Sequence, residues 1–177
     1  MIKYAITDSS FFSLDNANDY FSKLDADFVL YRDKNNPNYS SDAKKLLRLY
    51  NKLDFKIIIH QDYKLAKTLK VDGVHLSSNQ FNSIKEAKTL GLFTIVSTHS
   101  IKEIKEAKKL GADAVTFSPI FSTPNKGVPK GINALKDAVN CCDIKVIALG
   151  GIVTKDHIKQ IKTTKAWGFA SIRYFKP

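Results

Sequence analysis

Two loops of this 177-residue chain carry groups that are well suited to bind an anion. The longer one lies within residues 111–131, where an apolar segment leads through Ser118-Pro119 into a run rich in Ser, Thr, Pro, Gly and Lys. The shorter one is Gly150-Gly151, which follows another apolar segment. Backbone N–H groups exposed at such a turn before a helix commonly bind phosphate. By itself, a Gly-Gly pair is as often only a tight turn.

Cationic, hydroxyl and histidine side chains gather directly after predicted strands, and acidic residues are scarce among them. These residues are Arg32, Lys34, His60, Gln61, His75, Ser97, Thr98, His99, Thr123, Asn125 and Lys126. Because the C-terminal ends of parallel strands form one face, we expect these side chains to meet there. Cations and hydroxyls without carboxylates favour a phosphorylated small molecule as the ligand.

The three histidines in this set allow other interpretations. His75 lies inside its predicted strand, so we expect it to be a hydrogen-bonded core residue. A zinc site on His60, His75 and His99 is less favoured, because no acidic or cysteine residue is spaced to complete it. We therefore expect no metal site in this set.

Strand-like and helix-like patterns alternate along the whole chain. The predicted strands are 3–7, 27–31, 55–59, 73–76, 93–96, 112–117, 145–149 and 168–172. Between them, apolar residues recur at helical spacing, as at Ala43, Leu46, Leu47 and Tyr50. Eight strands alternating with seven helices predict one α/β domain over residues 1–177, a parallel (β/α)8 TIM barrel. An open doubly wound sheet is the rival architecture.

An internal repeat supports the barrel prediction, and the last predicted strand lies close to the end of the sequence. IKEAKTLG at 84–91 recurs as IKEAKKLG at 104–111, and each glycine suits a helix C-terminus that leads into the next strand. After the last predicted strand there is no room for a final helix. We therefore expect one flank of the barrel to be uncovered, which would suit a subunit interface in a homo-oligomer.

Charge and cysteine content restrict the partners and the compartment. The net charge is +11, from 28 Lys and Arg against 17 Asp and Glu, which favours anionic partners. The cations are spread over several predicted helices as solvated faces, so we expect no nucleic-acid partner. Cys141 and Cys142 are adjacent and unsuited to a disulfide scaffold. No apolar run is long enough to span a membrane, and no signal peptide precedes the first strand, so we expect a cytoplasmic protein without a membrane partner.

Six motifs, in order and at consistent spacing, resemble the thiamin phosphate synthase and TenI-type thiazole tautomerase superfamily over nearly the whole chain. They are YAITD at 4–8, VLYRDK at 29–34, DGVHL at 72–76, VSTH at 96–99, SPIFSTPNK at 118–126 and IALGGI at 147–152. Together they are far more specific than any one of them. The resemblance implies the same barrel and a thiazole or thiamin monophosphate bound at its C-terminal face.

The tautomerase branch is the function that the sequence favours. In that branch the histidine that resembles His99 moves a proton on a thiazole carboxylate phosphate, and a side chain that titrates near neutrality suits this step. No cofactor is then expected. The residues expected to bind the substrate or its phosphate are Arg32, Lys34, His60, Ser97, Thr123, Asn125, Lys126, Gly150, Gly151 and Arg173.

The synthase branch is the first alternative, and it would require Mg²⁺ to help a pyrimidine diphosphate lose its diphosphate. The two carboxylates that hold this ion in the family fall at Gln61 and Gln80, and neutral amides bind Mg²⁺ poorly. The family's motif glutamine falls at Leu30, one loop threonine at Asn125, and a phosphate-side serine at Arg173. A non-catalytic protein that senses or carries the phosphorylated ligand is the second alternative.

Overall fold

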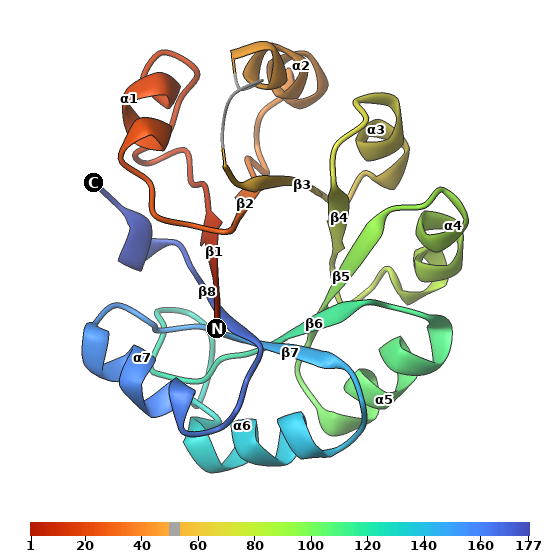
Figure 1. Ribbon diagram of the computed structural model, residues 1–177, viewed down its shortest axis with the longest axis vertical. Helices are drawn as coiled ribbons and strands as arrows, with labels where there is room; N and C mark the ends of the chain where they lie inside the picture. The colour runs from red at the N-terminus through yellow and green to blue at the C-terminus, as the bar shows by residue number, and fades with distance from the viewer. Residues whose placement is uncertain (50–53) are drawn as a thin grey trace.

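The computed structural model describes residues 1–49 and 54–177, and its strands close into a parallel barrel in chain order (Figure 1). The predicted helix residue Tyr50 lies outside the described residues. The strands are β1 (Ile2–Ile6), β2 (Phe28–Tyr31), β3 (Lys56–His60), β4 (Gly73–Leu76), β5 (Phe93–Thr98), β6 (Ala114–Phe117), β7 (Lys145–Leu149) and β8 (Gly168–Ser171). Because β8 pairs with β1 in parallel, the sheet has no open edge. The predicted barrel is confirmed, and the open sheet is wrong.

Helices lie outside the strands and follow them in alternation (Figure 1). They are α1 (Ala17–Ser22), α2 (Tyr39–Leu49), α3 (Tyr63–Thr68), α4 (Ile84–Thr89), α5 (Ile101–Leu110), α6 (Gly131–Asn140) and α7 (Lys155–Lys162), with the short 3₁₀ turns η1 (Phe81–Ser83) and η2 (Arg173–Phe175). The predicted boundaries hold to within a few residues. Ser40 and Ser41, serines of a type that often caps helices, lie inside α2, because this helix already begins at Tyr39.

Side-chain caps fix where several helices begin. Thr154 caps α7, because its side chain accepts a hydrogen bond from the His157 amide. Ser100 and Glu103 form a reciprocal capping box at α5. The carboxylate of Asp62 accepts a 2.8 Å hydrogen bond from the Leu65 amide and caps α3. This cap leaves Asp62 at a helix start on the rim of the barrel.

The inside of the barrel is a packed core at its N-terminal end. Buried apolar side chains fill the lumen, and Phe28, Phe93 and Trp167 form an aromatic layer with ring centroids 5.7–6.1 Å apart. Lys145 lies over Phe93 and Trp167. A filled lumen leaves room for a ligand only at the C-terminal ends of the strands.

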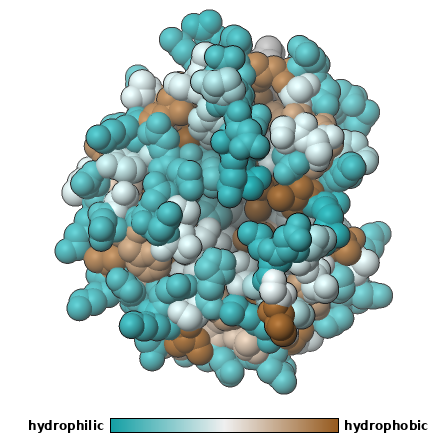
Figure 2. Space-filling model, turned by 180° about the vertical axis from the view of Figure 1, so that it is seen from behind, coloured by the Kyte–Doolittle hydropathy of each residue, from teal (hydrophilic) through white to brown (hydrophobic). Residues whose placement is uncertain are grey.

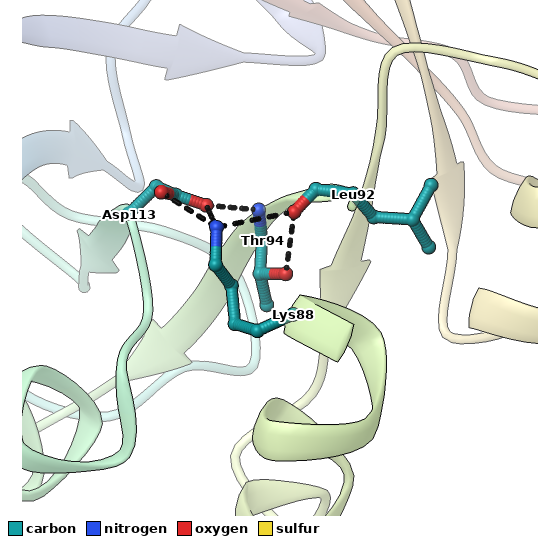
Figure 3. A network of polar contacts seen from close by, with 4 residues as sticks. All are labelled: Lys88, Leu92, Thr94 and Asp113. Atoms are coloured by element: carbon teal, nitrogen blue, oxygen red, sulfur yellow. Dashed lines mark hydrogen bonds and ion pairs between the residues drawn. The ribbon is translucent and has the colours of Figure 1, made fainter. Parts of the chain in front are cut away.

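A charged network joins α4 to the starts of β5 and β6 (Figure 3). Lys88 Nζ lies 2.8 and 2.6 Å from the two carboxylate oxygens of Asp113. The same carboxylate accepts a 2.7 Å hydrogen bond from the amide of Thr94. The carbonyl of Leu92 accepts from the Thr94 hydroxyl at 3.2 Å. Asp113 therefore fixes the register at which two neighbouring strands begin.

Removal of the Asp113 carboxylate is expected to destabilise the barrel. In Asp113→Ala the Thr94 amide loses its acceptor and Lys88 loses its partner, so we expect the free energy of unfolding to fall by about 1–3 kcal/mol. Urea denaturation followed by circular dichroism measures this change. Asp137→Ala, at an exposed position of α6, is the control and should stay within about 0.5 kcal/mol of the wild type. Equal stability of the two variants would contradict the role of the network.

One flank of the barrel carries only the turn η2 and the C-terminus, between α1 and α7 (Figure 1). Tyr174 and Phe175 pack there against Phe169, and a notch of about 350 Å³ separates them from Tyr20. The face shown in Figure 2 is hydrophilic over most of its area, with scattered apolar residues. Among the described residues, no helix is long and apolar enough to cross a membrane.

Candidate functional site

A cavity of about 490 Å³ opens at the C-terminal ends of the strands. Most of the residues expected at this face line it, and Asn125 and Thr98 are the exceptions. Thr98 is buried, and its hydroxyl donates to the Thr116 carbonyl at 2.8 Å. The proposed residues on the cavity wall are Arg32, Lys34, His60, Ser97, His99, Thr123, Lys126, Gly150, Gly151 and Arg173. Leu30, where the family's motif glutamine falls, also lines the cavity. Sequence reasoning did not assign the other apolar side chains on the wall, namely Ile6, Leu149, Ile152 and Ile172. The cavity therefore offers cations and polar groups beside an apolar wall, which suits a phosphorylated heterocycle.

Thr7 holds Arg32 at the end of β2. The Thr7 hydroxyl accepts a 2.8 Å hydrogen bond from the Arg32 amide and donates to the Arg32 carbonyl at 3.2 Å. The guanidinium lies 3.6 Å from the carboxylate of Asp8. Because the pair spans two neighbouring strands, the arginine is positioned without being neutralised by a carboxylate inside the cavity.

Tyr39 connects the ends of β2 and β3 and was not found from the sequence. Its hydroxyl donates a 2.7 Å hydrogen bond to the Tyr31 carbonyl and accepts one of 3.1 Å from the His60 amide. Its ring stacks on Tyr31, with centroids 4.9 Å apart and planes at 8°. The only sequence signal is an aromatic residue at the start of a helix. Tyr39 therefore fixes the backbone at His60, beside Arg32.

The cations of the cavity act on one another. Arg32 is the main cause that lowers the pKa of Lys34, and partial burial and Lys126 lower it further. Burial, with the charges of Arg32 and Lys34, lowers the pKa of His60 from 6.5 to about 4. His60 is therefore neutral at pH 7. A cluster of like charges with no acidic partner on the cavity wall attracts an anion, whose binding relieves the mutual repulsion.

His75 links the barrel core to the cavity. Its Nδ1 lies 3.0 Å from the Tyr4 hydroxyl, and its Nε2 lies 3.0 Å from the Ser97 hydroxyl. Burial raises the pKa of Tyr4, so the phenol keeps its proton, and His75 Nδ1 is the acceptor within its reach. The proton of the neutral imidazole then lies on Nε2 and is donated to Ser97. The hydroxyl proton of Ser97 is consequently left for an acceptor on a ligand.

The two neutral histidines make the stability of the fold depend on pH. Burial and neighbouring cations lower the pKa of His60 to about 4, and burial, His60 and Arg32 lower that of His75 to about 3. The unfolded chain therefore binds more protons than the folded one below pH 6.5, so stability decreases as the pH falls from 6.5 towards 4. Each histidine contributes a slope of up to about 1.4 kcal/mol per pH unit.

Urea denaturation between pH 5 and 7 measures this slope. We expect the free energy of unfolding to fall on acidification in the wild type, and to fall about half as steeply in His75→Gln. His99→Gln changes an exposed histidine and is the matched control, with a wild-type slope expected. A His75→Gln slope equal to that of the wild type would show that His75 is not held neutral by burial.

His99 follows β5 and faces the start of the long loop after β6. Its Nδ1 lies 3.1 Å from the Ser118 carbonyl, which can only accept, so Nδ1 carries the proton of the neutral ring. The Ser118 hydroxyl lies 3.3 Å from the same nitrogen. This arrangement leaves Nε2 unprotonated. His99 therefore has the geometry of a base on the cavity wall. The partner of its Nδ1 is a backbone carbonyl, that of Ser118, and not a carboxylate.

The loops after β6 and β7 interlock. The Ile120 amide donates to the Leu149 carbonyl and the Phe121 amide to the Gly150 carbonyl, each at 3.0 Å. Within the loop after β6, the Lys126 amide donates to the Thr123 carbonyl at 3.3 Å, which turns the chain towards the cavity. Asn125 occupies this turn with a φ of 60° and lies outside the cavity wall. Its role in binding stays a prediction, and its place in the structure is in the turn.

Gly150 and Gly151 leave their loop open to a phosphate. Both have positive φ, at 98° and 70°. Within the described parts of the chain, the amides of Gly151 and Ile152 donate to no other group. Arg173 lines the same cavity from the turn after β8. Free amides and a guanidinium together are a suitable site for one phosphate group.

The residues that would hold Mg²⁺ in a synthase do not fit that ion. Gln61 and Gln80 stand where carboxylates are expected, and the oxygen of Gln80 already accepts from the amide and hydroxyl of Ser77 at 3.0 and 2.9 Å. Asp62 is committed to capping α3. Across residues 1–49 and 54–177, no three His, Cys, Asp or Glu side chains are grouped to hold a metal ion. This donor set lacks the charge that Mg²⁺ requires.

The fold and the cavity define a class, the TIM barrels that bind phosphorylated ligands at the C-terminal ends of their strands. Comparison with known proteins identifies the family within this class. The sequence profile of a family described as thiamine monophosphate synthase matches residues 3–175. This protein belongs to the thiamine monophosphate synthase family, and its place is therefore in thiamine biosynthesis.

Individual relatives agree with this assignment. The thiamine-phosphate synthase of Salinibacter ruber is 31% identical over 82% of this chain and 66% of its own length. That of Thermoplasma acidophilum is 30% identical over 82% of this chain and 69% of its own. The chain thus spans about two thirds of these curated relatives. The solved thiamine phosphate pyrophosphorylase of Pyrococcus furiosus superposes with a TM-score of 0.83 at 26% identity, covering 99% of this chain and 90% of that one.

Proposed function

We propose that this protein joins a pyrimidine diphosphate to a thiazole phosphate, the reaction implied by its resemblance to the thiamin phosphate synthases. The cation-rich cavity without an acidic residue carries the proposal. Arg32, Lys34 and Lys126 offer one anion site, and the Gly151 loop with Arg173 offers a second, so two phosphorylated substrates have complementary places. The relatives from Salinibacter ruber and Thermoplasma acidophilum carry the name of a thiamine-phosphate synthase, which also supports it.

The proposed reaction moves electrons without moving protons. The carbon–oxygen bond between the pyrimidine methylene and the diphosphate breaks, and its electron pair leaves on the diphosphate oxygen. The lone pair of the thiazole nitrogen then forms the new carbon–nitrogen bond. The rate therefore depends on stabilising negative charge on the departing diphosphate, which cationic side chains do when they are already in place. Arg32, held by Thr7, is such a preorganised group.

The tautomerase branch, expected from the sequence, is the second candidate. Two observations favour it: His99 lines the cavity with Nε2 unprotonated, and the positions expected to hold Mg²⁺ carry no carboxylate. Nε2 would remove one proton from a thiazole carboxylate phosphate and return it at another atom of the ring system. The names of the relatives support the synthase instead, so we place the tautomerase second.

Purified protein incubated with both substrates tests the proposal. One reaction contains thiazole phosphate and pyrimidine diphosphate, and the product is followed by chromatography. A second contains thiazole carboxylate phosphate alone, and isomerisation is followed by NMR. The proposal expects coupled product in the first and an unchanged ligand in the second. Isomerisation without coupling would favour the tautomerase, and ligand binding with no turnover in either reaction would favour a non-catalytic carrier.

The variant His99→Gln separates the two candidates a second way. Because coupling needs no base, we expect its rate to stay within about threefold of the wild type. A tautomerase that uses His99 as its acid and base would lose about 10²–10⁴-fold in this variant. Retention of coupling together with wild-type binding of thiazole phosphate is the expected result. A hundredfold loss of coupling would assign His99 a chemical role that the proposed reaction does not contain.

A further inference from the structure

We propose that the cavity binds the diphosphate group as a free anion, with Arg32, Lys34 and Lys126 in the place of a divalent cation. The inference rests on the proposed function for the identity of the diphosphate substrate. It concerns what neutralises that group, and it differs from the Mg²⁺ site that the family resemblance implies.

The donor set of the cavity is the first argument. None of the residues on its wall is acidic. Two carboxylates close to it are already used, since Asp8 pairs with Arg32 and Asp62 caps α3. Asp33, between Arg32 and Lys34 in the sequence, is not among the described residues on the wall. Mg²⁺ keeps several waters and is normally held by one or two carboxylates in addition to substrate phosphates. Among the described residues, a metal at this wall would meet amides, hydroxyls and imidazoles, and no carboxylate.

The arrangement of Gln61 and Gln80 is the second argument. The Gln80 oxygen accepts from the Ser77 amide at 3.0 Å and from the Ser77 hydroxyl at 2.9 Å, and its Nε2 donates to the Gln61 carbonyl at 3.3 Å. The side chain therefore ties the loop after β4 to the end of β3. Its oxygen already has two donors, so Gln80 acts as a neutral link between loops.

The mutual repulsion of the cations is the third argument. Arg32, Lys34 and Lys126 line the same cavity, and Arg32 and Lys126 both lower the pKa of Lys34, which lies between them in this repulsion. A divalent cation would add to this repulsion, whereas a diphosphate relieves it. It follows that Mg²⁺, which reduces the charge of a free diphosphate in solution, should weaken binding to this cavity.

Titration calorimetry of the full chain with inorganic pyrophosphate tests the inference. We expect binding in EDTA, and equal or weaker binding when Mg²⁺ is in excess. Lys126→Met should weaken the interaction at least tenfold in EDTA, and Lys136→Met, an exposed lysine of α6, should leave it unchanged. Binding that requires Mg²⁺, or no binding in either buffer, would overturn the inference.

A second variant reverses the sign of the metal effect. Gln61→Asp combined with Gln80→Asp places two carboxylates on the cavity rim, so we expect binding at least tenfold weaker in EDTA and restored by Mg²⁺. Gln160→Asp, an exposed position on α7, is the control for added charge. The coupling reaction separates this inference from the proposed function. Coupling that occurs only with Mg²⁺ would overturn the inference alone, and pyrophosphate binding in EDTA without any coupling would overturn the function alone.

Discussion

Replacement of Arg32 by methionine is expected to lower the coupling rate by about 10²–10³-fold, the usual effect of removing one preorganised group that stabilises developing negative charge. The backbone of Arg32 is fixed at both its amide and its carbonyl, by the Thr7 hydroxyl at 2.8 and 3.2 Å. Methionine keeps most of the length of the side chain and removes its charge. The loss should therefore lie in turnover, with the fold unchanged.

Steady-state kinetics with saturating thiazole phosphate measures the effect of Arg32→Met. The Tm of the variant should be within a few degrees of the wild type, because Arg32 makes only one long ion pair, with Asp8 at 3.6 Å. Arg48→Met, an exposed arginine of α2, is the matched control and should keep the wild-type rate. A rate within threefold of the wild type in Arg32→Met would remove Arg32 from the site of diphosphate departure.

The second large effect is expected from Gly151→Ala, which closes the phosphate loop. A Cβ atom at this position would lie 2.5 Å from the Ser122 carbonyl oxygen and 2.6 Å from that of Phe121, so the backbone must shift. The φ of 70° adds strain for any residue with a side chain. We expect thiazole phosphate to bind at least tenfold more weakly, and the free energy of unfolding to fall by about 1–3 kcal/mol.

Gly127→Ala is the control that separates strain from steric contact. Gly127 has the same φ of 70° and lies on the neighbouring loop, but a Cβ atom there meets nothing within 4 Å. This variant should lose about 1 kcal/mol of stability and bind thiazole phosphate as the wild type does. Titration calorimetry and urea denaturation of both variants provide the comparison. Equal binding by the two would contradict the assignment of the Gly150-Gly151 loop to the phosphate.

The fold was predictable because its signal is local and repeated. Each strand is an apolar run, each helix shows 3.6-residue spacing, and the two alternate from Ile2 to Ser171. The ring closure follows from the number of units. The predicted strand boundaries were less accurate where a side chain takes part in hydrogen bonds at the end of a strand. Asp113, predicted as part of a strand, instead bonds through its carboxylate to Lys88 and Thr94, and β6 begins at Ala114.

Many residues on the cavity wall were predictable from the sequence, and the residues that position them were not. Cations and glycines after strands reach the cavity because of the topology, as Arg32, Lys126 and Gly151 do. Thr7 and Tyr39 act through contacts between elements far apart in the sequence, and a threonine or tyrosine gives no local sign of such a partner. Asn125, expected on the cavity wall, lies outside it, in a turn with positive φ that its residue type also suits.

The central claim is that one cavity holds two anions at separate places, and backbone amide NMR of the full chain tests it most directly. Thiazole phosphate is added first and inorganic pyrophosphate second, in EDTA. The account predicts that the first ligand shifts the amides of Gly150, Gly151 and Ile152, and that the second shifts those at Arg32 and Lys34 without displacing the first. Displacement of one ligand by the other, with both shifting the same amides, would contradict it.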